Sequence, residues 1–200
     1  PMVLMGWASC SHSGTGHAAL PDPRAVDKSV PEYKNPFHPS TYAHFVARKD
    51  YRKTYDVYKD DTLLNRQPKK SRKIFVCLDE QRGQYLVDGL VAMDFPLSSG
   101  VKAYPTKTGD YAVISKKEDH ASNLYGKMYD AEGKCINYNA ESTDPIPEGG
   151  RFDGSPMPYW QRLTNAGLGL HVGKVRRHPV SHGCVRLPRN VAEILYRQTS

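Results

Sequence analysis

The chain has 200 residues, with 28 Lys and Arg against 21 Asp and Glu and a formal net charge of +7. Its hydrophobic fraction of 38% and charged fraction of 24% are ordinary for a globular domain, so collagen-like and wholly disordered chains are excluded. No stretch of the sequence approaches the roughly 20 apolar residues that a membrane-spanning helix requires. The excess positive charge indicates anionic partners, and nucleic acid, an acidic membrane surface and an acidic polymer are the candidates.

The first segment, Met2–Cys10, combines a short apolar run with small residues before a cysteine. This pattern resembles the end of a bacterial lipoprotein signal, in which the cysteine becomes the lipidated first residue of the mature protein. Two interpretations of residues 1–20 stay open. Either Cys10 carries a lipid that attaches the protein to a membrane, or the segment is a flexible start with an ordinary cysteine.

Residues 21–72 form a polar, proline-rich N-terminal extension whose tyrosines lie among basic residues. Tyrosines alternating with Lys and Arg are compatible with stacking on nucleic-acid bases, but no recognition motif accompanies them, so we expect no nucleic-acid partner. The spacing of apolar residues predicts a short amphipathic helix over 41–58. We expect this extension to pack as an arm on the main domain, with residues 66–73 as a solvated linker or a surface patch.

From residue 73 onward the pattern changes to short strands, which we expect at 73–79, 84–87, 90–95 and 111–115. Asp88-Gly89 lies between two of these apolar runs and predicts a tight hairpin.

The last third of the chain contains one irregular region and one helix. Residues 136–160 hold four prolines and three glycines, which predicts a long loop, and long loops in compact domains are often lids. Residues 190–198 predict a helix capped by Asn190, with Val191, Ile194 and Leu195 on its apolar side.

The positive charge is also uneven along the chain. Residues 1–73 hold 13 Lys and Arg against 7 Asp and Glu, a net of +6, whereas residues 74–200 have a net of only +1. No acidic residue occurs between Asp153 and Glu193, although six cations do: Arg162, Lys174, Arg176, Arg177, Arg186 and Arg189. This acid-free stretch is therefore the most specific candidate for contact with an anion.

The same stretch contains a pattern suited to nucleophilic catalysis, His171 followed by Ser181-His182-Gly183-Cys184. A cysteine nucleophile needs a base, donors for an oxyanion and a scaffold that directs both at one carbonyl. His171 and His182 are candidate bases, and Gly183 allows a tight turn that would present the amides of Gly183 and Cys184 to a substrate. We expect the surrounding cations to favour the thiolate form of Cys184.

This string resembles the signature of the L,D-transpeptidases of bacterial cell walls, the YkuD-like catalytic domain. The resemblance covers about residues 73–198, within an expected catalytic domain of residues 73–200. Ser98-Ser-Gly100, Pro105-Thr-Lys-Thr-Gly109 and Met157-Pro-Tyr-Trp160 with Arg162 are similar to further turns and the lid end of that family. It implies a mostly β fold, a mixed β-sandwich catalytic domain with a long capping loop and few helices. The N-terminal extension lies outside it.

The resemblance also implies a function, peptidoglycan cross-linking, and assigns roles to residues. Cys184 becomes the nucleophile and His171 the base, with its second ring nitrogen held by a backbone carbonyl, while Ser181, His182 and Gly183 shape the site. Arg186 is expected to pair with a substrate carboxylate or to brace the loop. The expected substrate-binding residues are Met157, Tyr159, Trp160, Arg162 and Arg186.

The expected partners are a donor and an acceptor stem peptide of peptidoglycan, bound by a monomer without a cofactor in the periplasm or cell envelope. Several alternatives stay open. The acyl group of the thioester could pass to water, which would make the protein a carboxypeptidase or hydrolase. A wall-binding protein without catalysis is a third hypothesis. For Tyr159 and Trp160, packing under the lid is an alternative to substrate contact.

Two alternatives concern the cysteines and histidines themselves. His171, His178, His182 and Cys184 have the ligand types of a zinc site, but their spacing matches no closed zinc pattern, so we expect no metal. Cys77 and Cys135 are candidates for a disulfide in an oxidising periplasm.

Overall fold

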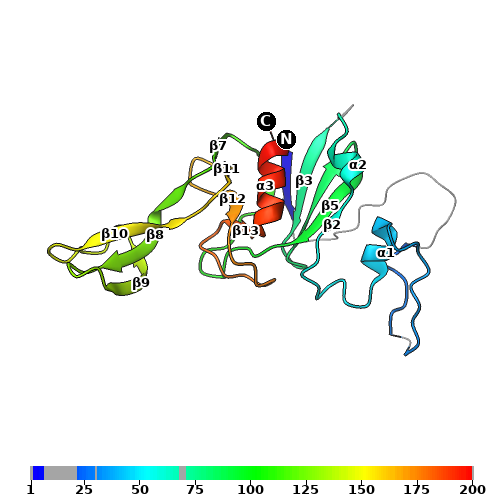
Figure 1. The fold of residues 1–200 in the computed structure, drawn as a ribbon, viewed down its shortest axis with the longest axis horizontal. Coiled ribbons are helices and arrows are strands. Elements are labelled where there is room, and N and C mark those ends of the chain that lie inside the picture. The colour runs from blue at the N-terminus through cyan, green and yellow to red at the C-terminus, as the bar shows by residue number, and fades with distance from the viewer. Residues whose placement is uncertain (1, 7–21, 30, 68–70, 200) are drawn as a thin grey trace.

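The structure is a computed structural model that describes residues 2–6, 22–29, 31–67 and 71–199. Three sheets and three short helices occur in these residues (Figure 1). The largest sheet has six strands in the order β2 (Tyr58–Lys59), β5 (Leu90–Pro96), β4 (Arg82–Val87), β3 (Arg72–Cys77), β1 (Met2–Gly6) and β6 (Gly109–Ala112). The second has four strands in the order β13 (Val185–Leu187), β12 (Gly169–Val172), β11 (Trp160–Arg162) and β7 (Ser115–Lys117). The predicted mostly β fold with few helices is confirmed.

The hydrophobic core joins the six-stranded sheet, the four-stranded sheet and helix α3 (Arg189–Gln198). Ile74 and Phe95 of the first sheet and Leu170 of the second are fully buried in one cluster with Val191 and Leu195 of the helix. Burying an aliphatic side chain of this size contributes about 1.5–3 kcal/mol, so this shared core holds the two sheets together. It therefore fixes the position of the four-stranded sheet, on which the candidate site is built.

Local sequence signals predicted the central hairpin correctly. β4 and β5 pair antiparallel, and Asp88 and Gly89 between them have φ angles of 51° and 84°. Two successive positive φ angles define the turn that matches the twist of the flanking strands, and Asp-Gly is a preferred pair for it. Helix α3 also forms where predicted, but Pro188 precedes its first turn and makes no side-chain cap, so Asn190 lies inside the helix and is not its cap.

The start of the chain differs from the predicted flexible segment. Met2–Gly6 forms β1, which pairs parallel with β3 and antiparallel with β6. The apolar run that resembles a signal sequence is thus placed in the sheet as a strand. Cys10 and the interpretation that it is lipidated lie outside the described residues. No helix in the described part of the chain is long and apolar enough to cross a membrane.

The arm packs on the six-stranded sheet through a buried polar network. Tyr42 and Tyr51 each donate a hydroxyl hydrogen bond to Asp94 Oδ2 at 2.8 Å, and Arg82 Nε donates to Asp94 Oδ1 at 2.7 Å. The Arg82 guanidinium also donates to the backbone carbonyls of Thr54 and Asp56, which belong to the arm. These contacts tie residues 42–56 to strands β4 and β5.

The two arm helices are short. Helix α1 (Tyr42–Ala47) is shorter than the predicted helix over 41–58, because Arg48 is extended with ψ 143° and ends it. Tyr51 and Tyr58 nevertheless pack around Phe45, so the predicted apolar grouping forms without a continuous helix. Helix α2 (Asp61–Leu64) follows, capped by Asp60, whose side chain accepts from Leu63 N.

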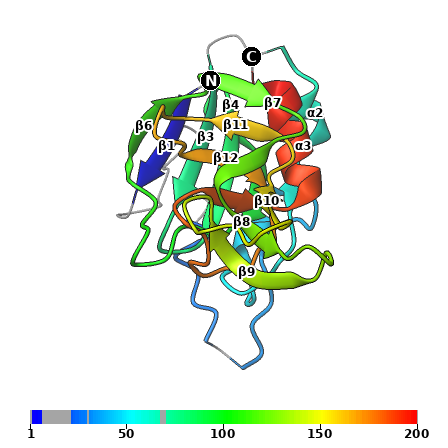
Figure 2. The same cartoon turned by 90° about the vertical axis from the view of Figure 1, so that its left-hand side faces the viewer.

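The predicted lid loop is largely a sheet. Its three antiparallel strands, in the order β10 (Arg151–Pro156), β8 (Ala121–Tyr129) and β9 (Cys135–Glu141), project from the body at the end opposite α1 (Figure 1). Turned toward the viewer, this lid sheet lies in front of the rest of the fold (Figure 2). The irregularity predicted from Pro and Gly remains in the 142–150 connection, in the turn at 157–159 and in bulges of the β8 pairings. The segment is ordered by pairing with β8, a strand that the sequence analysis did not predict.

Candidate active site

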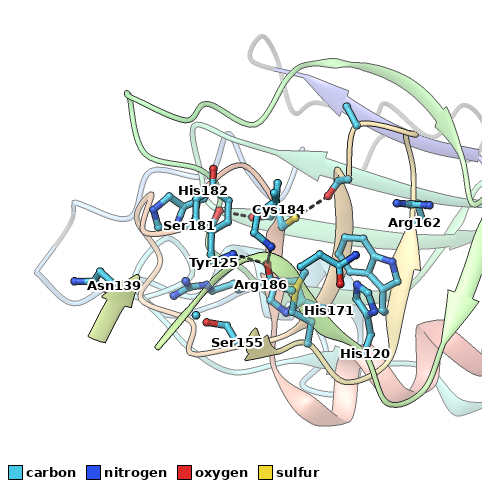
Figure 3. A pocket seen from close by; sticks show the side chains of 18 of the residues that line it. His120, Tyr125, Asn139, Ser155, Arg162, His171, Ser181, His182, Cys184 and Arg186 are labelled. Carbon is cyan, nitrogen blue, oxygen red and sulfur yellow. Dashed lines mark hydrogen bonds between the residues drawn. The ribbon is translucent and has the colours of Figure 1, made fainter. Parts of the chain in front are cut away.

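A cavity of about 450 Å³ lies between the lid sheet and the four-stranded sheet (Figure 3). It contains the sulfur of Cys184, and residues from both sheets line it. From the lid sheet come Tyr125, Asn139 and Ser155, and from the body come Arg162, His171, Ser181, His182 and Arg186. The candidate catalytic side chains thus come from the body, and the lid sheet forms the opposite wall of the cavity.

Strand register arranges the side chains that the four-stranded sheet contributes to the cavity. β12 pairs antiparallel with β11, with Arg162 opposite Gly169, and parallel with β13, with His171 opposite Arg186. Paired residues of neighbouring strands point to the same face of a sheet, so His171 and Arg186 stand side by side. Two positions earlier, where the same register is extended, Cys184 lies beside Gly169 and points to the same face. The nucleophile and base predicted from sequence thus project from adjacent rows of one sheet face.

His171 is oriented for use as a base. It is buried, and its Nδ1 lies 2.8 Å from the backbone oxygen of Val172. A carbonyl only accepts hydrogen bonds, so Nδ1 carries the proton and Nε2 has a free lone pair. Burial, with smaller contributions from Arg186 and His120, lowers the pKa of His171 to about 4 against the opposing effect of the Val172 bond. The imidazole is neutral at neutral pH, and the predicted backbone partner is present.

Cys184 differs from the prediction. Its Sγ donates to the backbone oxygen of Gly167 at 3.3 Å, and burial raises its pKa above the ordinary value, outweighing the lowering by the Gly169 backbone bond and Arg186. The surrounding cations therefore do not produce a thiolate in this state, because most of them lie outside the cavity and desolvation opposes charge. The resting pair is a neutral thiol and a neutral imidazole.

The loop before the nucleophile also corrects one expectation. Ser181 Oγ donates to the backbone oxygen of Cys184 at 2.5 Å and accepts the amide of Gly183 at 3.1 Å. The amide of Gly183 already donates to Ser181 Oγ, so the prediction that it is available to a substrate is wrong. The amide of Cys184 makes no hydrogen bond with any described residue, so it is the available donor for an oxyanion.

Two turns noticed in the sequence brace this loop. Thr106 Oγ1 accepts the amide of Gly100 at 2.8 Å and donates to the backbone oxygen of Gly183 at 2.6 Å. Gly183 has φ 112°, a backbone conformation that residues with a Cβ rarely adopt. A Cβ on Gly100 would lie 2.0 Å from the backbone oxygen of Tyr104 and 2.8 Å from Gly183 Cα. Both glycines are needed for the close approach of these backbones.

Aromatic contacts connect the lid with the loop. The ring of Tyr125, from β8, stacks on that of His182 with centroids 4.1 Å apart and planes 18° apart, and Tyr104 lies 4.8 Å away on the same imidazole. His182 is exposed and makes these contacts instead of supporting Cys184 directly. On the other side of the cavity, Trp160 lies between His120 and His171, with centroid distances of 5.1 Å and 6.0 Å.

Four of the five expected substrate-binding residues line the cavity: Met157, Trp160, Arg162 and Arg186. Tyr159 does not. Its φ of 54° turns it to the opposite side, where its ring packs on Tyr196 of helix α3 with centroids 5.5 Å apart. Tyr159 therefore packs on helix α3 and lies outside the cavity. The lining residues that sequence reasoning missed, His120, Tyr125, Asn139 and Ser155, lie on or beside the lid strands and belong to no local motif.

The remaining alternatives can be compared with the structure. Cys135 is a free thiol, so the disulfide between Cys77 and Cys135 is not formed. His178 is exposed and contacts the backbone oxygen of Arg176. In the described ranges no group of three or more His, Cys, Asp or Glu side chains is arranged to hold a metal ion.

A comparison with protein families gives a match over the larger part of the chain. Residues 71–200 match the YkuD family, described as the L,D-transpeptidase catalytic domain, and the chain belongs to this family. A search of curated proteins gives no match.

Solved structures of similar proteins are also found. An L,D-transpeptidase from Mycobacterium smegmatis is 22% identical with a TM-score of 0.46, covering 62% of this chain and 52% of that one. The catalytic domain of the Enterococcus faecium L,D-transpeptidase is 26% identical with a TM-score of 0.46, covering 66% and 92%. LdtMt1, in complex with imipenem, is 21% identical with a TM-score of 0.45, covering 62% and 52%. This chain thus spans about half the length of the first of these proteins.

Proposed function

We propose that the protein is a cysteine-dependent L,D-transpeptidase that cross-links peptidoglycan stem peptides. Membership of the family supports the class of reaction. The observation that carries the proposal is that Cys184 and His171 lie on one sheet face inside one cavity. The backbone amide of Cys184 has no described acceptor, and His171 carries its proton on Nδ1, which leaves Nε2 free to act as the base. The donor is a stem peptide, and the acceptor is an amine of a neighbouring stem.

The first half of the reaction forms a thioester. As Cys184 Sγ attacks the donor carbonyl carbon, its proton leaves the Gly167 carbonyl and passes to His171 Nε2. The carbonyl oxygen becomes an oxyanion, which accepts a hydrogen bond from the backbone amide of Cys184. The oxyanion then collapses, the carbon–nitrogen bond breaks, and the leaving terminal D-alanine takes the proton from His171. Because both groups start neutral, the charge separation develops only during attack.

The second half transfers the acyl group. The acceptor amine attacks the thioester carbon, gives a proton to His171, and the same amide of Cys184 stabilises the second oxyanion. Collapse expels the Cys184 sulfur, which recovers its proton from His171. If water takes the place of the amine, the same steps make a carboxypeptidase or a hydrolase, which is the second candidate function.

A product analysis tests this proposal. The protein and its Cys184→Ala variant are incubated with purified disaccharide-tetrapeptides, and the products are weighed by mass spectrometry. Cross-linked dimers with loss of D-alanine from the unmodified protein only are the expected result. Tripeptide monomers would establish the hydrolase, whereas unchanged substrate with both proteins would refute catalysis and leave a wall-binding role.

A second test uses a covalent probe. One similar protein has a solved complex with imipenem. We expect imipenem to add to Cys184 as an intact acyl adduct detectable by mass. Cys135→Ser, which removes the other free thiol among the described residues, should leave this adduct unchanged. An adduct on Cys135 alone would contradict an activated Cys184.

The proposed substrate places the protein in the periplasm or cell envelope, acting as a monomer. Lipid attachment at Cys10 remains a proposal from the sequence, and processing before Cys10 would remove β1 from between β3 and β6. Detergent partitioning of the native protein, with and without Cys10→Ala, decides it. Partitioning that does not change in the variant would exclude the lipid.

A further inference from the structure

Arg162 is a cavity-lining cation to which the proposed chemistry gives no task. It lies in β11, two residues after Trp160, so both side chains project from the sheet face that carries His171. Arg162 forms no ion pair with any described carboxylate, and its Nε is buried without an acceptor. Leaving a buried donor unpaired costs about 1–3 kcal/mol, so packing alone does not account for an arginine here.

The surroundings of Arg162 suit a carboxylate. No Asp or Glu lines the cavity, so a guanidinium there has no competing partner from the protein. His120 borders the same part of the cavity, above the ring of Trp160, and it is close enough to Arg162 that this charge and that of Lys117 add to burial in lowering the pKa of His120. A guanidinium binds a planar carboxylate through two parallel hydrogen bonds, and a neutral imidazole adds a further donor.

The cavity therefore holds two cationic positions. Arg186 lies beside the reacting groups, since its charge influences both Cys184 and His171. Arg162 in β11 lies two strands from Arg186 in β13, on the other side of Gly169 in β12. A donor that reaches both positions needs one carboxylate near the scissile bond and another at the end of a side chain.

We infer that Arg162, assisted by His120, binds a free carboxylate at the end of the side chain of the donor's third residue. This inference rests on the proposed function and narrows its substrate. The site would then select a diamino acid whose side chain ends in a free carboxylate, against the corresponding amide and against a diamino acid without that carboxyl group. Arg162 is a specificity residue in this scheme and takes no part in proton transfer.

Three synthetic disaccharide-tetrapeptides that differ only at this group test the inference. Their third residues carry a side-chain carboxylate, the primary amide or no carboxyl group, and release of terminal D-alanine gives kcat/KM for each. The unmodified protein should prefer the carboxylate donor by about tenfold or more. Arg162→Gln should lose this preference, because kcat/KM should fall more on the carboxylate donor than on the amide donor. Arg162→Lys should keep part of the preference.

The matched control is Arg176→Gln, an exposed cation of the same acid-free stretch that does not line the cavity. It should keep the full preference. Equal use of all three donors by the unmodified protein would overturn the inference while leaving the proposed function intact, as would an equal loss on all three in Arg162→Gln. Absence of D-alanine release from every donor would refute the proposed function, and the inference with it.

Discussion

Arginine is buried in one region of this protein and half-buried in another, and the two regions differ in whether the protein supplies its partners. At the junction between arm and sheet, Arg82 is 2% exposed and pairs with Asp94, which is fully buried and also accepts from two tyrosines. In the cavity, Arg162 and Arg186 make no ion pair with any residue that the structure describes. A buried charge whose partners are all supplied by the protein holds a structure together, whereas one left without a partner is available to a ligand.

The largest effect should come from breaking the paired region. Asp94→Asn leaves Arg82 as an uncompensated buried cation, and we expect the free energy of unfolding to fall by about 3–5 kcal/mol. Urea denaturation measures it. The control is Asp153→Asn, which disrupts the exposed pair of Arg151 and Asp153 and should cost no more than about 1 kcal/mol. Similar losses in the two variants would refute the structural role assigned to Asp94.

The next effect concerns the pH dependence of stability that His171 imposes. Its pKa is about 4 in the folded protein and about 6.5 when unfolded, so the unfolded chain binds more protons between these values. The contribution of His171 to the free energy of unfolding is fully present above pH 6.5. It is lost as the pH falls toward 4, and the loss amounts to about 3 kcal/mol. His171→Asn should remove this part of the decline in urea titrations at pH 7 and pH 4.5. An unchanged decline in the variant would show that the imidazole is not buried as a neutral group.

A smaller effect, on activity alone, should follow from removing an unpaired arginine. We expect Arg186→Gln to lower kcat/KM by about tenfold to a hundredfold, because a charged hydrogen bond to substrate contributes about 1.5–3 kcal/mol. Its free energy of unfolding should stay the same or increase, since no ion pair is lost. The two measurements together distinguish this arginine from Arg82. A loss of stability matching that of Asp94→Asn would contradict the comparison.

The smallest effect is expected at Tyr159, which packs on helix α3 outside the cavity. Tyr159→Phe keeps the ring, so kcat/KM should change by less than about twofold and stability by less than about 0.5 kcal/mol. Trp160→Phe, one residue later but inside the cavity, should reduce kcat/KM more strongly. A larger effect on turnover at Tyr159 than at Trp160 would reverse our assignment of the two faces.

Much of the site could be predicted because its information is local. Ser181 to Cys184 are consecutive, and the short strands around Asp88-Gly89 follow from alternation and turn chemistry. The lid could not be predicted in the same way. Its strand β9 is ordered by pairing with β8, and proline and glycine content alone indicates a loop.

The electrostatic state of the site also escaped sequence reasoning. Counting cations near Cys184 predicted a thiolate, but the sequence does not show which cations reach the cavity or how far the sulfur is desolvated. The occupied amide of Gly183 is a similar case, because it depends on the side-chain direction of Ser181. These are properties of packing in three dimensions.

The sequence by itself determined the family of this protein, the identity of the candidate nucleophile and base, and the acid-free stretch that contains them. Those features depend on residue type and on separation along the chain. The tertiary structure decided that Arg162 and Arg186 face the cavity without acidic partners while Arg82 is paired elsewhere, and that Tyr159 faces away. The reason is physical: pairing, burial and desolvation depend on which distant residues meet, and strand register brings those residues together only in the folded protein.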